Sequence, residues 1–210
     1  VHGAYSMADE LGTQRPKNVT TIKPSGTLSK IMDTTEGCHK PMGKYIFNNV
    51  NFSINDPMLP KLREAGYHVV INPTDDHNCL VTFPVAWENI RFDKNEEGIY
   101  VNMETAVEQL ERYRLLMASY VEQNCSITVS YKEDEVPSIR AWLKHHWDSY
   151  VGVSFMPVDN TVYSYLPQEV VSEVRYKEYV DQLTEVDFSN TESSLELEED
   201  ECVSGVCPTK

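Results

Sequence analysis

Two cysteines close to the end of the sequence are suited to redox chemistry. Cys202 and Cys207 lie in the segment ECVSGVCPTK, with Gly205 between them. A short separation with a flexible glycine makes an intramolecular disulfide easy to close. The pair could therefore act as a dithiol shuttle, in which a thiolate attacks a disulfide elsewhere and an external dithiol protein reduces the product. The alternative is a pair of terminal cysteines without a role, and the acidic neighbours favour the less reactive, protonated thiol.

A second candidate for chemistry is the segment Pro24-Ser25-Gly26-Thr27-Leu28-Ser29, which follows a β-rich run at 19–23. Gly26 would let the backbone approach a ligand, and three hydroxyls flank it. If a helix starts here, its free N–H groups and positive end suit a phosphate. The segment lacks the Lys and the second Gly of a Walker loop, so it is not a P-loop. A plain turn with a helix N-cap is the alternative.

The remaining cysteines point away from a metal site. Cys38 precedes His39 in a loop, but neither CxxC nor HxxxH spacing stands nearby, and zinc sites need about four ligands. Cys79 and Cys125 lie in apolar, strand-like runs and are predicted to be inert core thiols. An odd, sparse set of five cysteines is unlike a secreted disulfide framework and is typical of a cytoplasmic protein.

The elements that position these residues alternate between strand and helix. Strands are expected at 19–23, 45–54, 79–85, 126–131 and 150–155, and helices at 4–11, 58–65, 104–123, 137–146 and 168–183. This alternation favours an α/β sheet or barrel over an all-β sandwich.

The charge of the chain excludes several partners. Its 210 residues include 18 basic and 33 acidic side chains, which give a net charge of −15. An unassisted nucleic-acid binder normally carries a basic face, and an anionic membrane surface attracts basic segments, so neither partner is expected. The sequence also has no apolar stretch approaching the roughly 18 residues of a membrane-spanning helix.

The acidic residues are concentrated in a tail. Eight acids and no base lie between Glu185 and Glu201, so the residues from 185 onward carry −7 and the first 184 carry −8. The tail is poor in large apolar side chains and cannot offset the entropy of ordering it. We therefore expect a folded domain at 1–184 and an acidic, flexible tail at 185–210 that carries the two terminal cysteines.

Several motifs together resemble those of ribonucleotide reductases. TTIKPSGTLSKI, followed by Thr35-Glu36-Gly37-Cys38-His39, resembles their substrate-phosphate loop, and the Pro-Ser-Gly-Thr form is similar to the adenosylcobalamin-dependent (class II) branch. The resemblance continues through FSINDP and NCSITVSY to about Leu183. The ending ECVSGVCPTK is similar to the C-terminal redox tail of the monomeric, triphosphate-reducing members.

The resemblance implies a fold and roles for particular residues. It implies the C-terminal portion of a ten-stranded α/β barrel with a flexible redox tail, in an enzyme that reduces ribonucleotides with adenosylcobalamin. Cys202 and Cys207 would reduce the active-site disulfide and be reduced by thioredoxin or a similar dithiol protein. The phosphate-binding positions would be Pro24, Ser25, Gly26, Thr27, Leu28 and Ser29.

The sequence also departs from the family. It contains no counterpart of the cysteine that becomes a thiyl radical, of the carboxylate two residues beyond it, or of the two cysteines that form the reducing disulfide. Because residue 1 is Val1, we expect a C-terminal piece whose partner is the N-terminal part of the same reductase.

Two alternatives to this function stay open. One is a fragment of a class I large subunit, although Tyr163 and Tyr165 are not the adjacent pair expected there. The other is a non-catalytic module that binds a phosphate ligand.

Overall fold

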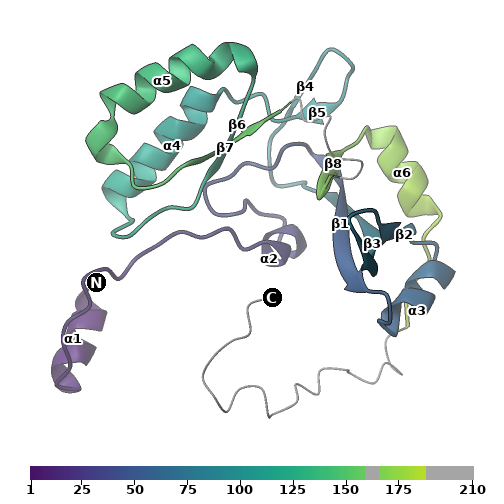
Figure 1. Cartoon of the computed structure of the whole chain (residues 1–210), viewed down its shortest axis with the longest axis horizontal. Helices are drawn as coiled ribbons and strands as arrows, with labels where there is room; N and C mark the ends of the chain where they lie inside the picture. The colour runs from purple at the N-terminus through teal and green to yellow at the C-terminus, as the bar shows by residue number, and fades with distance from the viewer. Residues whose placement is uncertain (159–165, 188–210) are drawn as a thin grey trace. The chain divides into compact units, whose positions relative to one another are not determined.

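The computed structural model describes residues 1–158 and 166–187 (Figure 1). The chain divides into two compact units. Of the described residues, the first comprises 1–49, 83–158 and 166–181, and the second comprises 50–82 and 182–187. Each unit contains both helices and strands. The mixed α/β class predicted from the sequence is therefore confirmed.

The first unit contains two helices packed against a pair of parallel strands. Helix α4 (Ala106–Ser119) lies on strand β6 (Thr128–Tyr131) and on helix α5 (Val136–His145) (Figure 1). Strand β6 pairs in parallel with β7 (Ser154–Pro157), with Val129 opposite Phe155. Two short 3-10 helices, Glu133–Glu135 and Trp147–Ser149, flank α5. The two helices therefore cover one face of this strand pair.

The start of α4 is fixed by a capping box. The hydroxyl of Thr105 accepts a hydrogen bond from the backbone N–H of Glu108, and the Glu108 carboxylate accepts one from the N–H of Thr105. This reciprocal arrangement satisfies backbone donors that a helix start leaves without partners. It sets where α4 begins and hence which of its side chains face β6.

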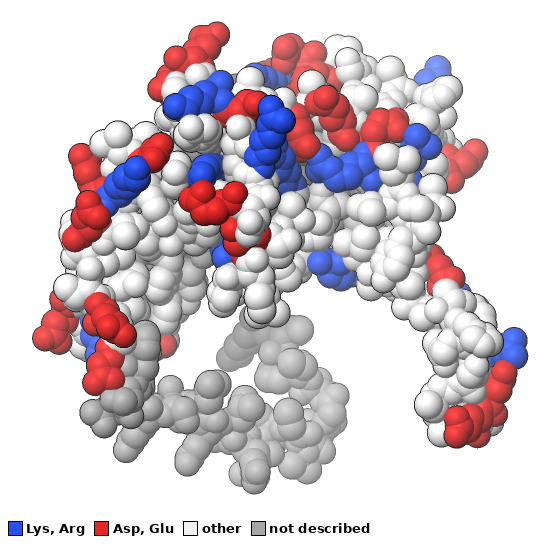
Figure 2. All heavy atoms as spheres, turned by 180° about the vertical axis from the view of Figure 1, so that it is seen from behind, with Lys and Arg blue, Asp and Glu red and all other residues white. Residues whose placement is uncertain are grey.

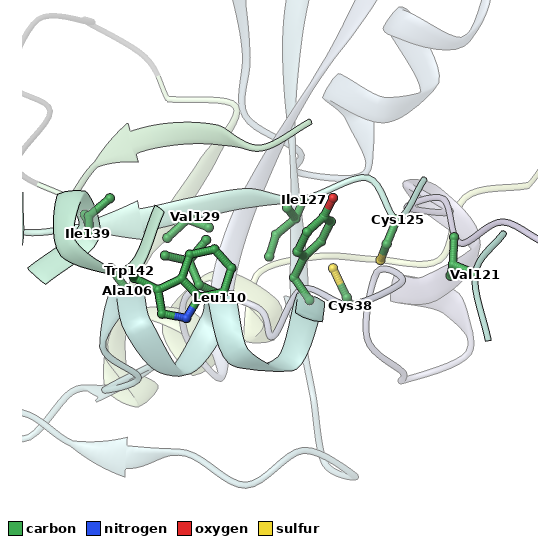
Figure 3. Packing of buried hydrophobic residues seen from close by; sticks show 10 residues of the cluster. Cys38, Ala106, Leu110, Val121, Cys125, Ile127, Val129, Ile139 and Trp142 are labelled. Atoms are coloured by element: carbon green, nitrogen blue, oxygen red, sulfur yellow. The ribbon is translucent and has the colours of Figure 1, made fainter. Parts of the chain in front are cut away.

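The main core of the first unit lies between α4, α5 and β6 (Figure 3). Leu110 and Tyr113 on α4 are fully buried, as are Val129 on β6 and Cys125 in the segment before it. Trp142 on α5 closes the cluster, and its Nε1 donates to Oε1 of Glu111 over 2.6 Å. The buried members of the cluster are Cys38, Ala106, Leu110, Tyr113, Val121, Cys125, Ile127, Val129, Ile139 and Trp142.

A second part of the first unit is built on strand β1 (Tyr45–Ser53), of which residues up to 49 belong to this unit. Its residues 46–48 pair antiparallel with β8 (Gln168–Val170). Helix α6 (Glu173–Asp181) follows, and the rings of Tyr45 and Tyr176 lie 4.9 Å apart. The expected single helix at 168–183 is therefore wrong in its first part, because pairing with β1 draws those residues into a strand. A two-stranded ribbon, β4 (Asp93–Lys94) and β5 (Tyr100–Val101), completes this part.

The second unit packs one helix near a hairpin. Helix α3 (Met58–Glu64) begins where the Asp56 carboxylate accepts a hydrogen bond from the N–H of Met58 over 2.8 Å. Strand β2 (Val69–Asn72) pairs antiparallel with β3 (Asp75–Ala86), of which residues up to 82 belong to this unit. The buried apolar side chains of this unit are Leu59, Leu62, Ala65, Cys79 and Val81, and Thr82 is also buried.

The N-terminal segment differs from expectation at one place. Helix α1 (His2–Glu10) confirms the predicted first helix, and the short helix α2 (Thr27–Ile31) begins within the candidate phosphate loop. The β-rich run at 19–23 forms only an isolated parallel bridge, between Ile22 and Cys125, and not a regular strand. Its side-chain hydroxyls hold it in place, because Thr20 and Thr21 donate to the carbonyls of Tyr120 and Asn124.

The surface is of mixed charge. On the face shown in Figure 2, Lys and Arg side chains are interspersed with Asp and Glu. Among residues 1–158 and 166–187, none of the helices has the length and apolar character needed to cross a membrane.

Candidate functional site

The candidate phosphate loop is a sharp turn between the bridge at Ile22 and helix α2. The N–H of Ser126 donates to the carbonyl oxygen of Ile22 over 3.0 Å, which anchors the segment that enters the turn. Gly26 is the N-cap of α2 and has φ +59° and ψ −106°. This backbone conformation suits glycine because a side chain would strain it. A helix does start within this loop, at Thr27, so the condition set by the phosphate-binding hypothesis is met.

The three hydroxyls of the loop do not share one environment. Ser29 is buried, and its Oγ donates to the carbonyl oxygen of Gly26 over 2.8 Å. Ser25 and Thr27 are exposed. Ser29 therefore closes the turn internally, while Ser25 and Thr27 are the hydroxyls open to an external ligand.

Lys30 fastens the turn from the helix side. Its Nζ donates to the carbonyl oxygen of Gly26 over 3.2 Å and forms an ion pair with the Glu36 carboxylate. The Lys30 side chain is 10% exposed. The Lys30 ammonium group thus links Gly26 to Glu36 in the 35–39 loop.

The loop that follows α2 packs against the entry to the turn. Gly37 has φ +61°, and a Cβ built on it would lie 3.1 Å from both Ile22 Cγ2 and the Lys23 carbonyl oxygen. Glycine is required here both by the backbone conformation and by this close approach. Lys23 is itself held, because its Nζ donates to Oγ of Ser126 over 2.8 Å.

His39 joins this loop to strand β6. Its Nε2 lies 2.6 Å from the backbone nitrogen of Thr128, and its Nδ1 lies 2.9 Å from the carbonyl oxygen of Glu36. Since the N–H of Thr128 donates to Nε2, the ring proton must be on Nδ1, which then donates to Glu36. Both ring nitrogens are engaged in holding the backbone.

Arg112 on α4 provides another long-range contact. It donates to the carbonyl oxygen of Cys38 over 3.0 Å and forms an ion pair with Glu104. Sequence reasoning missed the positioning roles of Arg112, His39 and Lys30. Their partners in the loop and in β6 are set by the fold, and no local motif signals them.

A hollow of about 400 Å³ lies beside the loop within the first unit. Its wall is about equally polar and apolar, and three hydroxyl-bearing residues, Ser126, Thr128 and Ser154, belong to it. The complete lining is Pro24, His39, Asn124, Ser126, Ile127, Thr128, Gly152, Val153 and Ser154. Of the six predicted loop positions, only Pro24 is part of this wall.

The thiols of the first unit are protonated at neutral pH. Burial raises the pKa of the Cys38 thiol to about 12, helped by its hydrogen bond with Cys125. Burial also raises the pKa of Cys125, while the hydrogen bond from Cys38 opposes that rise. The predicted burial of Cys79 and Cys125 is confirmed. Within residues 1–158 and 166–187, no three His, Cys, Asp or Glu side chains are grouped to hold a metal ion.

The other predicted site residues, Cys202 and Cys207, lie outside the described residues, as do Tyr163 and Tyr165. The structure therefore brings the candidate phosphate loop together with the 35–39 loop and with the segment before β6. The tail pair stays a prediction from the sequence.

Comparison with known proteins gives a consistent picture. No protein-family model matches the chain. It is 32% identical over 201 residues to a probable adenosylcobalamin-dependent ribonucleoside-triphosphate reductase of Dictyostelium discoideum, covering 91% of this chain and 26% of that protein. It is 27% identical over 210 residues to the adenosylcobalamin-dependent ribonucleoside-triphosphate reductase of Lactobacillus gasseri, covering 97% of this chain and 28% of that protein. The resemblance to class II ribonucleotide reductases is confirmed.

The fold agrees with this resemblance. A crystal structure of a B12-dependent (class II) ribonucleotide reductase superposes with a TM-score of 0.71 at 22% identity, covering 88% of this chain and 25% of that one. The chain thus shares its fold with one part of a class II reductase. It spans only about a quarter of the length of the reductases that it matches.

Proposed function

We propose that this chain takes part in the reduction of ribonucleotides, as triphosphates, to 2′-deoxyribonucleotides, and that it contributes the substrate-phosphate loop and a tail dithiol. The observation that carries the proposal is the turn at Gly26. It opens directly into α2 and leaves Ser25 and Thr27 exposed, in a chain similar over nearly its whole length to class II reductases. The curated relatives are named for ribonucleoside triphosphates and for adenosylcobalamin, which favours this function over a class I fragment.

In this proposal the loop holds the substrate by its phosphates. The first N–H groups of a helix have no partner within the helix, and those of Thr27 and Leu28 begin α2. Together with the hydroxyls of Ser25 and Thr27, they donate to phosphate oxygens. Pro24 and Gly26 set the path of the backbone, and Ser29 keeps it closed. Fixing the phosphates fixes the ribose, and a small displacement of a reacting group can cost a large factor in rate.

The tail would restore the reductant after each turnover. A thiolate of the Cys202–Cys207 pair attacks the active-site disulfide, the second thiol resolves the mixed disulfide, and thioredoxin or a similar dithiol protein reduces the tail. From Thr184 to Cys202 an extended chain reaches roughly 60 Å at 3.3–3.6 Å per residue. This exceeds the radius of a domain of this size, so length does not limit the shuttle.

In this proposal, the N-terminal part of the same reductase carries the cofactor and the radical residues. The complete enzyme acts in the cytoplasm. The two hollows described in this chain measure about 200 and about 400 Å³. Sites for drug-sized ligands already occupy about 300–1,000 Å³, and a corrinoid is much larger. Neither of these two hollows has the volume for adenosylcobalamin, and we assign none of the described residues to that cofactor.

The experiment that tests the loop is steady-state kinetics of the complete reductase with a ribonucleoside triphosphate. Ser25→Ala and Thr27→Ala should raise KM or lower kcat. Ser119→Ala is the matched control, because Ser119 is an exposed hydroxyl at the end of α4 that bonds only within its own helix turn. Unchanged kinetics in both loop variants would remove the phosphate-binding role.

A further inference from the structure

Two buried thiols meet beside the phosphate loop. Cys38 is 4% exposed and Cys125 is fully buried, and both are free. They hydrogen-bond to one another, and Sγ of Cys38 lies 3.5 Å from the carbonyl oxygen of Ser126, the residue that follows Cys125. Figure 3 shows the two side chains in the same core cluster. Neither thiol has a part in the proposed reaction.

The backbone places this pair at the two supports of the turn. Cys38 follows Gly37, which packs against Ile22 and Lys23. Cys125 forms the parallel bridge with Ile22. A bond between the two sulfurs would therefore join the 35–39 loop to the backbone at Cys125. That backbone also bridges Ile22, where the chain enters the candidate phosphate loop.

We propose that Cys38 and Cys125 are an oxidation site, at which a small-molecule disulfide such as oxidised glutathione converts the two thiols into a crosslink that clamps residues 22–39. A disulfide needs sulfurs about 2.05 Å apart and Cβ atoms that face each other. Thiols that already hydrogen-bond need only a small movement to reach that geometry. The proposal goes beyond nucleotide reduction and does not depend on it.

The structure also indicates which sulfur reacts first. The hydrogen bond that Cys125 accepts from Cys38 lowers the pKa of Cys125, and the positive charge of Lys23 lowers it further. Both oppose the rise that burial causes, so Cys125 forms the thiolate first. The Cys125 thiolate attacks the external disulfide, so that one S–S bond forms, one breaks, and a glutathione thiolate leaves and takes up a proton. Cys38 then loses its proton and attacks the sulfur of Cys125, which expels the second glutathione. Two protein thiols are oxidised and one glutathione disulfide is reduced to two thiols.

Burial makes this reaction slow at rest. The thiolate is the nucleophile, and burial raises the pKa of both thiols. A disulfide reagent must also wait for the 35–39 loop to open, since neither sulfur is accessible. The crosslink should therefore form over long exposure to oxidant and more quickly as pH rises.

The test uses the full chain with Cys202→Ser and Cys207→Ser, so that only three cysteines remain. The chain is incubated with oxidised glutathione and digested without reductant, and its peptides are identified by mass spectrometry. The expected product is a linked peptide pair that contains Cys38 and Cys125 and has lost two hydrogens. Hydrogen exchange of residues 22–39 should slow on oxidation, and the thermal unfolding midpoint should rise.

Matched variants separate this site from ordinary oxidation of buried thiols. Cys79→Ala removes a fully buried thiol of the second unit and should leave the linked pair and the rise in midpoint unchanged. Cys38→Ala and Cys125→Ala should abolish both. Absence of the Cys38–Cys125 peptide, links to Cys79 in equal yield, or unchanged hydrogen exchange at 22–39 after linkage would each overturn the proposal. The peptide map decides even if an alanine variant does not fold.

Discussion

The backbone N–H of Thr128 donates to Nε2 of His39 across 2.6 Å, while Nδ1 of the same ring faces the carbonyl oxygen of Glu36 at 2.9 Å. One imidazole thereby connects the loop behind α2 to the first residue of β6. Both ring nitrogens are engaged, so His39 holds the backbone that supports the candidate phosphate loop and has no nitrogen free for proton transfer.

Replacing His39 by Ala should destabilise the chain. The N–H of Thr128 would lose its acceptor, and an unsatisfied, partly buried backbone donor costs about 1–3 kcal/mol. Urea unfolding followed by circular dichroism measures the loss. His77→Ala is the control, because the His77 side chain is 90% exposed, and its effect should stay within about 0.5 kcal/mol. Equal losses in the two variants would contradict the role assigned to His39.

Replacement by Ala should lower stability at Ser29 and ligand affinity at Ser25. Ser29→Ala removes the buried hydrogen bond to Gly26 and should lower the free energy of unfolding by about 1 kcal/mol. Ser25→Ala should leave stability unchanged and weaken the binding of a ribonucleoside triphosphate. Thermal unfolding and isothermal titration calorimetry of each variant give the two readouts. A Ser29→Ala chain as stable as the unsubstituted one would show that the buried hydroxyl does not close the turn.

Gly37→Ala should cost more stability than Gly98→Ala. Both glycines have positive φ, +61° and +76°, so an L side chain is strained at either by about 1–2 kcal/mol. At Gly37 the new Cβ would also press on Ile22 and the Lys23 carbonyl, whereas at Gly98 nothing lies within 4 Å. The difference in unfolding midpoint between the two variants measures the cost of the contact between the new Cβ at 37 and its neighbours Ile22 and Lys23. A larger loss at Gly98 would be the contrary result.

Stability should fall as pH rises from about 9 to about 12, in part because of Cys38. The pKa of this thiol is about 12 in the folded chain against an ordinary value of 9.0. Between these values the unfolded chain has released the proton that the folded chain keeps, so rising pH favours unfolding. Below pH 9 the contribution is fully present.

This pH dependence is checked by comparison with Cys38→Ala under reducing conditions. The free energy of unfolding of the unsubstituted chain should decrease more steeply above pH 9 than that of the variant. Subtracting one curve from the other removes the titration of lysines and tyrosines common to both chains. Parallel curves up to pH 12 would mean that Cys38 does not keep its proton in the folded state.

Replacing Cys202 and Cys207 by Ser in the complete reductase should abolish multiple turnovers driven by thioredoxin. A single turnover, and turnover with a small dithiol that reaches the active site directly, should survive, since the tail acts only in re-reduction. Product formed per enzyme, with each reductant in turn, is the measurement. Cys79→Ala is the control. Unchanged thioredoxin-driven turnover would show that the shuttle assignment is wrong.

Much of the regular structure follows from local sequence. Pro137 in the first turn of α5, and Thr105 with Glu108 at the start of α4, are signals that a helix carries within itself, and both helices form where expected. The segment 168–170 shows where prediction from local sequence fails. Its residues suit an acidic helix, but pairing with β1 holds them in a strand, and no local pattern announces a partner more than 100 residues away.

The candidate site divides in the same way. A turn at Gly26 could be predicted from residue types, and a helix start after it was one of two open alternatives, the one that the structure has. The sequence shows three hydroxyls as equivalents, and burial alone separates Ser29 from Ser25 and Thr27. The contacts of Arg112 and His39 with the 35–39 loop arise from packing between distant segments and have no sequence signature.

The hydrogen bonds that anchor the entry to the phosphate loop join residues about 100 positions apart, from Thr21 to Asn124 and from Lys23 to Ser126. Contacts at such separation are slow to form, because the intervening chain must be brought together first. During synthesis the turn at Gly26 is thus made early but receives its support only after Ser126 has left the ribosome. The nucleotide binding proposed for this loop should accordingly be among the last properties that a growing chain acquires.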